Sequence, residues 1–278
     1  MGHFILSAFG DEISPHLDEQ VQILKAHGIS HLEFRNLENQ VIIDYSLPQV
    51  KEIYRRLADL GIAVSALGSP IGKIAVTDPF PSHLERFKKA LAVADALHTR
   101  YIRMFSFYIP AGADPALYRD EVLERWGQFI ATTEGTDFIL LHENEKAIYG
   151  DTAGRCLDLL QTLNNERVKA VFDPANFVQC GEQTYPYALS LLRKHVVYLH
   201  IKDALYRDQS VVPAGHGDAK IREILQCLEQ DGFSGFLSIE PHLDNSLPGG
   251  GPERFSIAVN ALKDILITLH KDNEAHKS

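Results

Sequence analysis

The chain has 278 residues, of which 45% are hydrophobic and 23% are charged, which excludes a disordered chain or a membrane protein as its main class. It carries 27 Lys and Arg against 37 Asp and Glu, a formal net charge of −10. With no basic run and no long apolar stretch, we expect neither nucleic-acid nor membrane partners. The three cysteines form no CxxC pair and the N-terminal stretch is too short for a signal peptide, so we expect a cytoplasmic protein.

Short apolar runs recur along the whole chain, and each is bounded by polar or turn-forming residues. The intervals between them fit one strand, one helix and two loops. We predict eight strands, at residues 4–9, 31–34, 62–67, 100–105, 137–141, 169–172, 195–199 and 235–239.

The segments between these runs carry apolar residues at helical spacing. Leu17, Val21 and Leu24 form one stripe, which ends before Gly28. A second stripe ends before Gly61, and others lie within residues 87–97, 157–163, 221–228 and 257–262. A glycine after such a stripe indicates a helix end, because glycine adopts the left-handed cap conformation at little steric cost.

Eight repeats of strand and helix predict an α/β fold, a single-domain (β/α)8 TIM barrel. The alternative is a doubly wound open sheet, which favours a GxGxxG fingerprint after its first strand. Here the first strand leads into Phe9-Gly10-Asp11-Glu12 instead. We place the barrel in residues 1–270 and expect residues 271–278 to form a polar C-terminal tail.

Polar residues follow directly after the last four predicted strands. These are Glu143, Asp173, His200 and Glu240, in chain order. In a barrel, the carboxyl ends of the strands surround the active site. A single such residue could be a loop start or a helix cap, but the repetition on four successive strands favours one common site.

Three carboxylates in one barrel mouth would repel one another unless a cation joined them. A divalent metal supplies that charge, and three oxygen ligands with one nitrogen suit Mn²⁺ first, with Mg²⁺, Co²⁺ or Zn²⁺ as alternatives. A doubly charged ion and three carboxylates leave one negative charge. We therefore expect a neutral polyol or keto-sugar as substrate rather than a phosphorylated one.

The pattern Glu143…Asp173…His200…Glu240 resembles that of the xylose-isomerase-like TIM barrels, the sugar (phosphate) isomerase/epimerase superfamily. The resemblance covers nearly the whole chain, from the first strand to Glu240-Pro241-His242. It implies that the four residues bind the metal and that Glu143 and Glu240 also act as catalytic acid/base groups. It further implies an isomerase or epimerase acting on a small-molecule sugar or polyol, and a homo-oligomer.

The implied reaction moves a proton at the carbon next to a sugar carbonyl, through a metal-bound enediolate. Two carboxylates on opposite faces would invert the centre, whereas one carboxylate acting between adjacent carbons would isomerise the sugar. Many epimerases of the superfamily carry a second His three residues after the strand-six Asp, where this chain has Asn176. An amide cannot carry a proton, so a keto-polyol dehydratase of the inosose type on the same barrel is the alternative function.

Five further residues are candidates for substrate binding. Asn176, Lys202, His142 and His242 adjoin the four predicted ligands, and Lys73 lies in a glycine-rich turn after the third strand. Each also has a structural interpretation, such as an internal pair between Lys202 and its neighbour Asp203.

Charged residues on the second and fourth strands leave two interpretations open. Glu33, Arg35 and Arg103 could form structural ion pairs in the barrel or contact the substrate. Two other functions are disfavoured. A DNA-repair endonuclease on this barrel would need more His and Glu ligands and a basic face, and a silent sugar-binding protein would be expected to have lost one of the four ligands.

Overall fold

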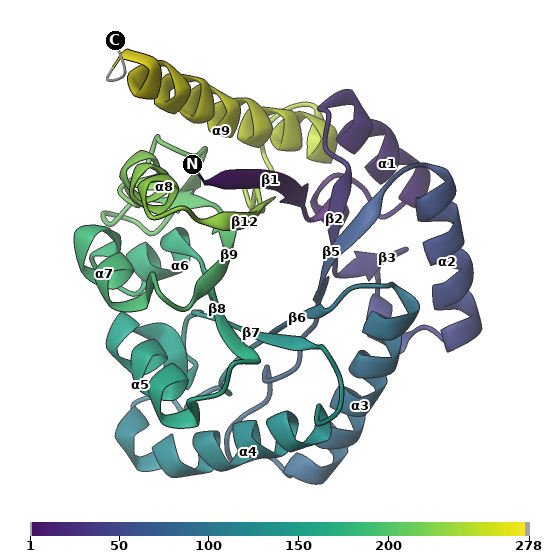
Figure 1. Ribbon diagram of the computed structural model, residues 1–278, viewed down its shortest axis with the longest axis vertical. Coiled ribbons are helices and arrows are strands. Elements are labelled where there is room, and N and C mark those ends of the chain that lie inside the picture. Colours follow the sequence, from purple (N-terminus) through teal and green to yellow (C-terminus); the bar gives the residue numbers. More distant parts are fainter. Residues whose placement is uncertain (1, 276–278) are drawn as a thin grey trace.

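Eight parallel strands form a nearly closed barrel in the computed structural model, which describes residues 2–275 (Figure 1). Their order is β1-β12-β9-β8-β7-β6-β5-β2, and a parallel bridge between Phe9 and Glu33 joins the two edge strands. The single-domain TIM barrel is confirmed, and each predicted strand overlaps one of the eight. The strands are β1 (His3–Ala8), β2 (His31–Phe34), β5 (Ala63–Gly68), β6 (Tyr101–Met104), β7 (Ile139–Glu143), β8 (Val168–Phe172), β9 (Val196–Ile201) and β12 (Ser234–Ile239).

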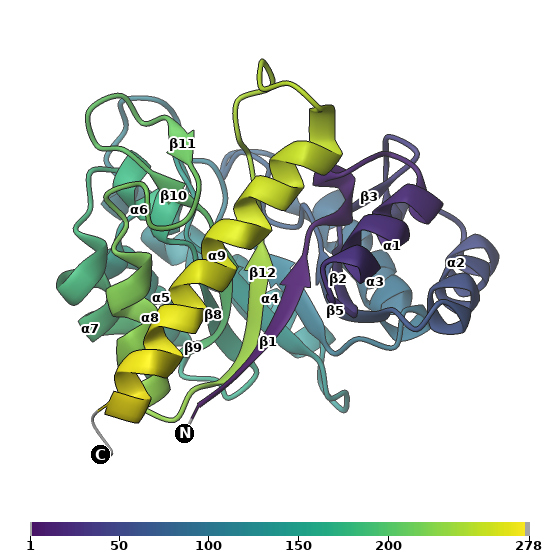
Figure 2. The same ribbon diagram turned by 90° about the horizontal axis from the view of Figure 1, so that it is seen from above.

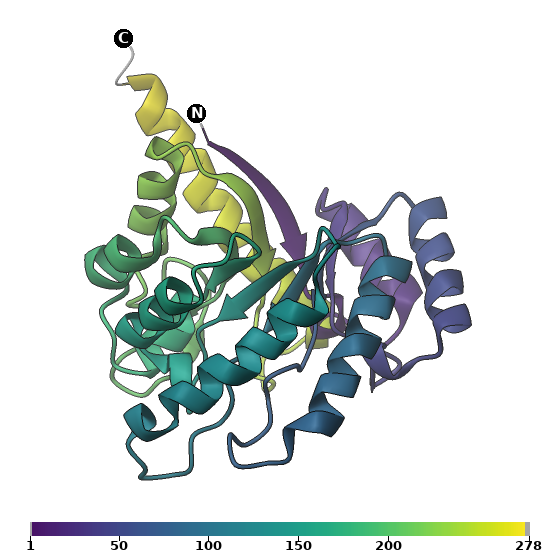
Figure 3. The same ribbon diagram turned by 60° about the horizontal axis from the view of Figure 1, so that its bottom comes forward.

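Helices surround the barrel, and Figure 3 shows α3 and α4 side by side on its outer surface. Each of the six predicted helical stripes overlaps a helix, and two of them end at the C-cap residues Leu60 and Leu97. The helices are α1 (Leu17–Ala26), α2 (Leu47–Asp59), α3 (Phe80–Ala96), α4 (Arg119–Thr132), α5 (Ala153–Leu163), α6 (Pro174–Gln179), α7 (Leu189–Leu192), α8 (Ile221–Gln230) and α9 (Gly250–Ala275).

The last helix extends beyond residue 270, where we expected the barrel to end and the polar tail to begin. Because α9 continues to Ala275, no helix end marks the start of the predicted polar tail. Residues 276–278 of that tail lie outside the described residues, so the division of the chain stays a prediction. None of the helices within residues 2–275 is long and apolar enough to cross a membrane.

The helix ends follow the sequence signals. Gly28 and Gly61 come just after α1 and α2 and have φ values of 71° and 72°, in the left-handed region that favours glycine. At its start, α5 is capped by the Thr152 side chain, which accepts a hydrogen bond from the Arg155 amide.

Alternation along the strands decides which side chains face the inside of the barrel. Leu141 of β7 and Tyr198 of β9 belong to a small apolar cluster, whereas their neighbours Leu140 and Leu199 belong to the larger core beneath the helices. Side chains on a strand repeat every two residues. The residues two positions after Leu141 and Tyr198 therefore also point inward, toward the mouth of the barrel.

Two short hairpins stand above that mouth. Figure 2 shows β3 (Asn36–Leu37) and the pair β10 (Asp203–Ala204) and β11 (Val211–Val212) on the side to which the strands point. The partner of β3 is β4 (Gln40–Val41). The N-terminus and the end of α9 lie at the opposite end of the barrel (Figure 2). The sequence analysis did not predict these hairpins.

Candidate active site

Glu143, Asp173, His200 and Glu240 meet in the barrel mouth. One ligand atom from each lies within 4.8 Å of the others, and all four residues are buried. They come from the ends of β7, β8, β9 and β12, which are neighbours in the sheet. The structure thus brings together the four residues that the sequence pattern singled out.

The imidazole of His200 is oriented by contacts on both of its nitrogens. Its Nδ1 lies 3.0 Å from Glu143 Oε1, 3.7 Å from Asp173 Oδ2 and 3.9 Å from Glu240 Oε2. Its Nε2 lies 3.1 Å from Oε2 of the fully buried Glu33. A carboxylate on the far nitrogen of a ligating histidine fixes the orientation of the ring. Nδ1 is therefore the nitrogen that faces the three carboxylates of the candidate metal site.

Asp173 Oδ2 is buried, and the nearest cation to it is the ammonium of Lys202. Three carboxylate oxygens and an imidazole nitrogen within 4.8 Å of one another form a buried donor set that is suited to a cation. Three oxygens and one nitrogen are ligands that Mn²⁺, Mg²⁺, Co²⁺ and Zn²⁺ accept.

Lys202 adds a positive charge to the same cluster. Its Nζ lies 2.8 Å from Asp173 Oδ2 and 2.8 Å from Glu240 Oε2. The carboxylates are therefore already joined by a cation of the protein. Repulsion among the carboxylates therefore does not by itself require a metal, and the metal assignment depends on the donor set.

Two arginines pair with the two catalytic candidates. Arg103 Nη1 lies 3.0 Å from Glu143 Oε2, and Arg35 Nη1 lies 2.9 Å from Glu240 Oε1. Arg103 Nε also lies 3.6 Å from Glu33 Oε1, which is the ion pair inside the barrel that the sequence left open.

These cations determine the ionisation of the two glutamates. Burial alone would raise the pKa of Glu143, but the charges of His200 and Arg103 outweigh it and hold that pKa well below its usual range. Burial is likewise outweighed at Glu240, where Lys202 and other nearby cations hold the pKa well below its usual value. Both carboxylates are ionised at neutral pH, the form that binds a metal or accepts a proton.

The charge of His200 follows from the same contacts. Burial lowers the pKa of its imidazole, but Glu143 and Glu33 outweigh burial and raise that pKa well above its usual value. Metal binding at Nδ1 requires the neutral form of this nitrogen, so it would release a proton.

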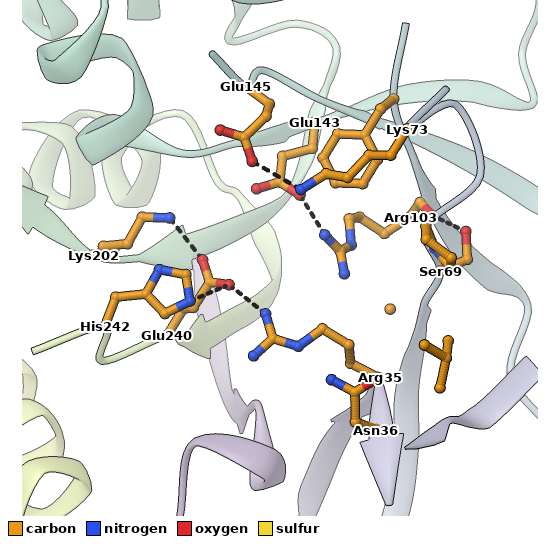
Figure 4. Close-up of a pocket in the computed structure, with 14 residues that line it drawn as sticks. Arg35, Asn36, Ser69, Lys73, Arg103, Glu143, Glu145, Lys202, Glu240 and His242 are labelled. Carbon is orange, nitrogen blue, oxygen red and sulfur yellow. Dashed lines mark hydrogen bonds and ion pairs between the residues drawn. The ribbon is translucent and has the colours of Figure 1, made fainter. Parts of the chain in front are cut away.

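The cluster opens into a cavity of about 240 Å³ (Figure 4). This volume is below the roughly 300–1,000 Å³ of sites for drug-sized ligands, as expected for a small metabolite. Glu143, Glu240 and three of the predicted substrate-binding residues line it: Lys73, Lys202 and His242.

Two of these lining residues have partners at the cavity wall. Lys73 Nζ lies 3.0 Å from Glu145 Oε2 and 4.2 Å from the centre of the Phe105 ring. His242 Nε2 lies 2.9 Å from Glu12 Oε1 and 3.4 Å from Glu240 Oε1.

Asn176 lies behind Glu143 rather than in the cavity wall. Its Nδ2 donates to Glu143 Oε1 at 3.4 Å and to the carbonyl of Asn144 at 2.9 Å. Its backbone amide donates to Asp173 Oδ1, which caps α6. The side chain therefore touches a predicted ligand and holds its position.

His142 points away from the cavity. It alternates with Glu143 along β7, so its ring faces the outer helices, where Nε2 lies 2.9 Å from Ser106 Oγ and the ring packs edge-on against Trp126. Burial lowers its pKa to about 4. The structure thus does not bring this predicted substrate-binding residue to the site.

The suggested pair between Lys202 and Asp203 does not form. The carboxylate of Asp203 instead accepts hydrogen bonds from four backbone amides, those of Ala204, Gly215, Gly217 and Ala219. Asp203 therefore holds the loop after β9, while Lys202 faces the cavity.

A family model for the xylose isomerase-like TIM barrel matches residues 21–265. The chain belongs to this family. The resemblance proposed from the four strand-end residues is thereby confirmed. No curated protein matches the sequence.

Solved structures with the same fold include proteins of several activities. A D-tagatose 3-epimerase-like protein shares 14% identity at a TM-score of 0.79, covering 96% of this chain and 99% of its own. The IOLI protein, solved with a bound zinc atom, shares 17% at 0.77, covering 95% and 99%. The probable 3-DHS dehydratase AsbF from Bacillus anthracis shares 16% at 0.72, covering 95% and 99%. At these identities the likeness establishes the fold and not the reaction.

Proposed function

We propose that this protein is a divalent-metal-dependent sugar isomerase or epimerase that moves a proton at the carbon next to a carbonyl. The observation that carries the proposal is the meeting of Glu143, Asp173, His200 and Glu240, of which Glu143 and Glu240 line a small cavity. Membership of the xylose isomerase-like family supports it. Mn²⁺ is the metal we propose, with Mg²⁺, Co²⁺ and Zn²⁺ as alternatives.

The four residues would hold the metal, which when bound would act as a Lewis acid toward the oxygens of the substrate. Glu143 and Glu240 are ionised and reach the cavity from β7 and β12, which are separated in the sheet by β8 and β9. Either carboxylate can accept the proton next to the carbonyl. If both act, the proton leaves from one side of the carbon and returns on the other, which inverts the centre.

Three cationic side chains would position the substrate. Lys202 lies beside Glu240 at the base of the cavity, and Lys73 and His242 lie in its wall. Their N–H groups can donate to hydroxyl and carbonyl oxygens. Asn176 would act through Glu143, whose Oε1 accepts from its amide.

A keto-polyol dehydratase of the inosose type is the second candidate. Its first step, removal of the proton next to the carbonyl, needs one base, so an amide at position 176 does not impair it. The likeness to a probable 3-DHS dehydratase shows that the same fold serves a protein of that class.

The expected partners and location remain part of the proposal. We propose a small-molecule sugar or polyol substrate, a homo-oligomer in the cytoplasm, and no nucleic-acid or membrane partner. The cavity volume of about 240 Å³ supports a small-molecule substrate.

Solvent deuterium exchange tests the proposed reaction. The protein is stripped with a chelator, reloaded with Mn²⁺ and incubated in D₂O with keto-sugars, aldo-sugars and inososes, and NMR detects deuterium next to the carbonyl. We expect exchange that requires metal, that falls at least about 10²-fold in E240Q, and that persists in E145Q. The labelled product then separates isomerase, epimerase and dehydratase.

Two outcomes would count against the proposal. Exchange that continues without metal or in E240Q would mean that the cluster is not the catalytic site. A tightly bound metal with no exchange across the panel would favour a sugar-binding protein.

A further inference from the structure

The cavity wall carries more positive charge than the four-residue cluster alone suggests. Four cationic side chains, those of Arg35, Lys73, Arg103 and Lys202, line it against three carboxylates. The charge count made from the sequence, which led us to expect a neutral substrate, included none of these cations. The charge of the substrate therefore has to be judged from which of them have free donors.

Arg103 is the buried cation with donors to spare. Its side chain is 5% exposed, and Nη1 donates to Glu143 Oε2 at 3.0 Å. Its Nε has no partner in hydrogen-bond geometry but lies 3.6 Å from Glu33 Oε1, and Nη2 makes no hydrogen bond to any residue within the described part of the chain. A guanidinium has five N–H donors, and leaving them unpaired in a buried site is costly.

The guanidinium of Arg103 is also held in one place. It lies 5.4 Å from the centre of the Phe9 ring and 4.8 Å from that of Phe105. The guanidinium of Arg35 lies 4.5 Å from the same Phe9 ring. Two guanidinium groups thus lie against one aromatic ring beside the cavity, which fixes the position of both.

The two arginines differ in how fully they are paired. The three guanidinium nitrogens of Arg35 donate to Asp11, Glu12 and Glu240 at 2.8 to 2.9 Å. Arg35 therefore contributes charge but few free donors. The nearby Glu240 is itself paired, since Lys202 Nζ lies 2.8 Å from its Oε2. Nη2 of Arg103, by contrast, donates to none of the described residues.

Space beside this nitrogen is kept open by Gly68. A Cβ at position 68 would lie 3.1 Å from Arg103 Nη2 and 3.1 Å from the Cβ of Arg35. Gly68 lines the cavity together with both arginines. A ligand atom can approach Nη2 over the glycine, where any side chain would stand in its way.

We propose that the cavity binds the carboxylate of an acidic substrate, a sugar acid or keto acid, against Nη2 of Arg103. One guanidinium with free donors matches a singly charged carboxylate. A phosphate needs several unpaired cations or a nest of backbone amides, and Arg35, Lys73 and Lys202 already pair with carboxylates. This inference adds a substrate class to the proposed function. It rests on that function only because the ligand would occupy the same cavity.

Calorimetric titration with three matched pairs of probes tests this assignment. Each pair differs only by a carboxylate in place of a CH₂OH group: gluconate and sorbitol, glucuronate and glucose, hydroxypyruvate and dihydroxyacetone. We expect the acid of at least one pair to bind about tenfold or more tightly than its alcohol.

Two variants locate the effect. R103K keeps a positive charge beside Glu143 but removes the Nη2 donor group. G68A places a methyl group next to Nη2 without changing any charge. Both should lose the preference for the acid. G127A is the matched control, because a Cβ at Gly127 in α4 meets nothing within 4 Å.

The inference is overturned if no acid binds more tightly than its alcohol, or if the preference survives in both R103K and G68A. Displacement of the acids by inorganic phosphate more strongly than by acetate would assign the site to phosphate and reject a carboxylate. Because calorimetry is independent of turnover, deuterium exchange with neutral sugars and no preference for acids would reject this inference and leave the proposed function standing.

Discussion

The ammonium of Lys202 lies 2.8 Å from Oδ2 of Asp173, a buried oxygen that is also a candidate metal ligand. The same ammonium lies 2.8 Å from Glu240 Oε2. A lysine of the chain and a divalent metal would thus act on the same pair of carboxylates. We therefore expect the stability of the barrel mouth to depend on both cations.

Removing this lysine tests that dependence. In K202M, two buried carboxylates lose a counter-charge, so with chelator present we expect the free energy of unfolding to fall by about 3–5 kcal/mol. Added Mn²⁺ should raise the free energy of unfolding of K202M by more than it raises that of the wild type. Urea unfolding with and without Mn²⁺ measures both effects.

The control is K73M, which removes a lysine from a partly exposed pair with Glu145. We expect a loss of about 1 kcal/mol or less, equal with and without Mn²⁺. If K202M behaved like K73M, the ammonium of Lys202 would not be a structural counter-ion of the cluster.

Glu33 should tune metal affinity without being a ligand. Its carboxylate contacts His200 Nε2, on the far side of the ring from the cluster. In E33Q the ring loses an ionised acceptor, so we expect Mn²⁺ affinity to fall about 10–100-fold with the four ligands intact. Mn²⁺ titration followed by electron paramagnetic resonance gives the dissociation constant. E145Q, at the cavity wall, serves as the control, and equal affinities in the two variants would contradict the role assigned to Glu33.

A buried histidine outside the four-residue cluster should make the stability of the fold sensitive to acid. Nε2 of His83 accepts a hydrogen bond from the Gly72 amide at 2.8 Å, in the turn that carries Lys73. Burial, with the charges of Arg86 and Arg125, lowers the pKa of His83 to about 4. The unfolded chain binds this proton near pH 6.5. The stability from neutral His83 is therefore present above pH 6.5 and is lost as the pH falls toward 4.

The substitution H83Q isolates this contribution, because an amide oxygen can accept from Gly72 without titrating. Between pH 6.5 and 4, we expect stability to fall less steeply than in the wild type, by up to about 1.4 kcal/mol per pH unit. Urea unfolding at a series of pH values measures the slope. Part of the slope should remain in H83Q because His142 also contributes to it, since burial lowers the pKa of His142 to about 4. An unchanged slope in H83Q would show that His83 is not the titrating group.

The barrel and the four clustered residues could be predicted because both follow from short-range patterns. Strand and helix alternate along the chain, and Glu143, Asp173, His200 and Glu240 each come at the end of a buried strand. Closure of the parallel sheet then brings these ends together, whatever the details of the helices.

Other parts were missed although the sequence carried a signal. Val122, Trp126 and Phe129 are buried in α4 at helical spacing, yet this helix was not predicted. Alternation along β7 also separates His142 from Glu143, because adjacent side chains on a strand point to opposite faces. The same rule would have removed His142 from the predicted substrate-binding residues.

The remaining contacts could not be obtained from local patterns. The contacts of Lys202 with Asp173 and of Arg103 with Glu143 depend on which strands are neighbours in the closed sheet. The hairpins β3–β4 and β10–β11 are only two residues per strand, too short to show alternation. These contacts changed the charge count of the cavity, and with it the expected substrate.

Mn²⁺ binding to the chelator-stripped wild type and to D173N tests the central claim most directly. In D173N the side-chain oxygen can still cap α6, so the fold should survive while one charged ligand is lost. We predict one tightly bound ion per wild-type chain, retained in E145Q and weakened at least about tenfold in D173N. Absence of binding to the wild type, or equal binding to D173N, would contradict a metal centre formed by Glu143, Asp173, His200 and Glu240.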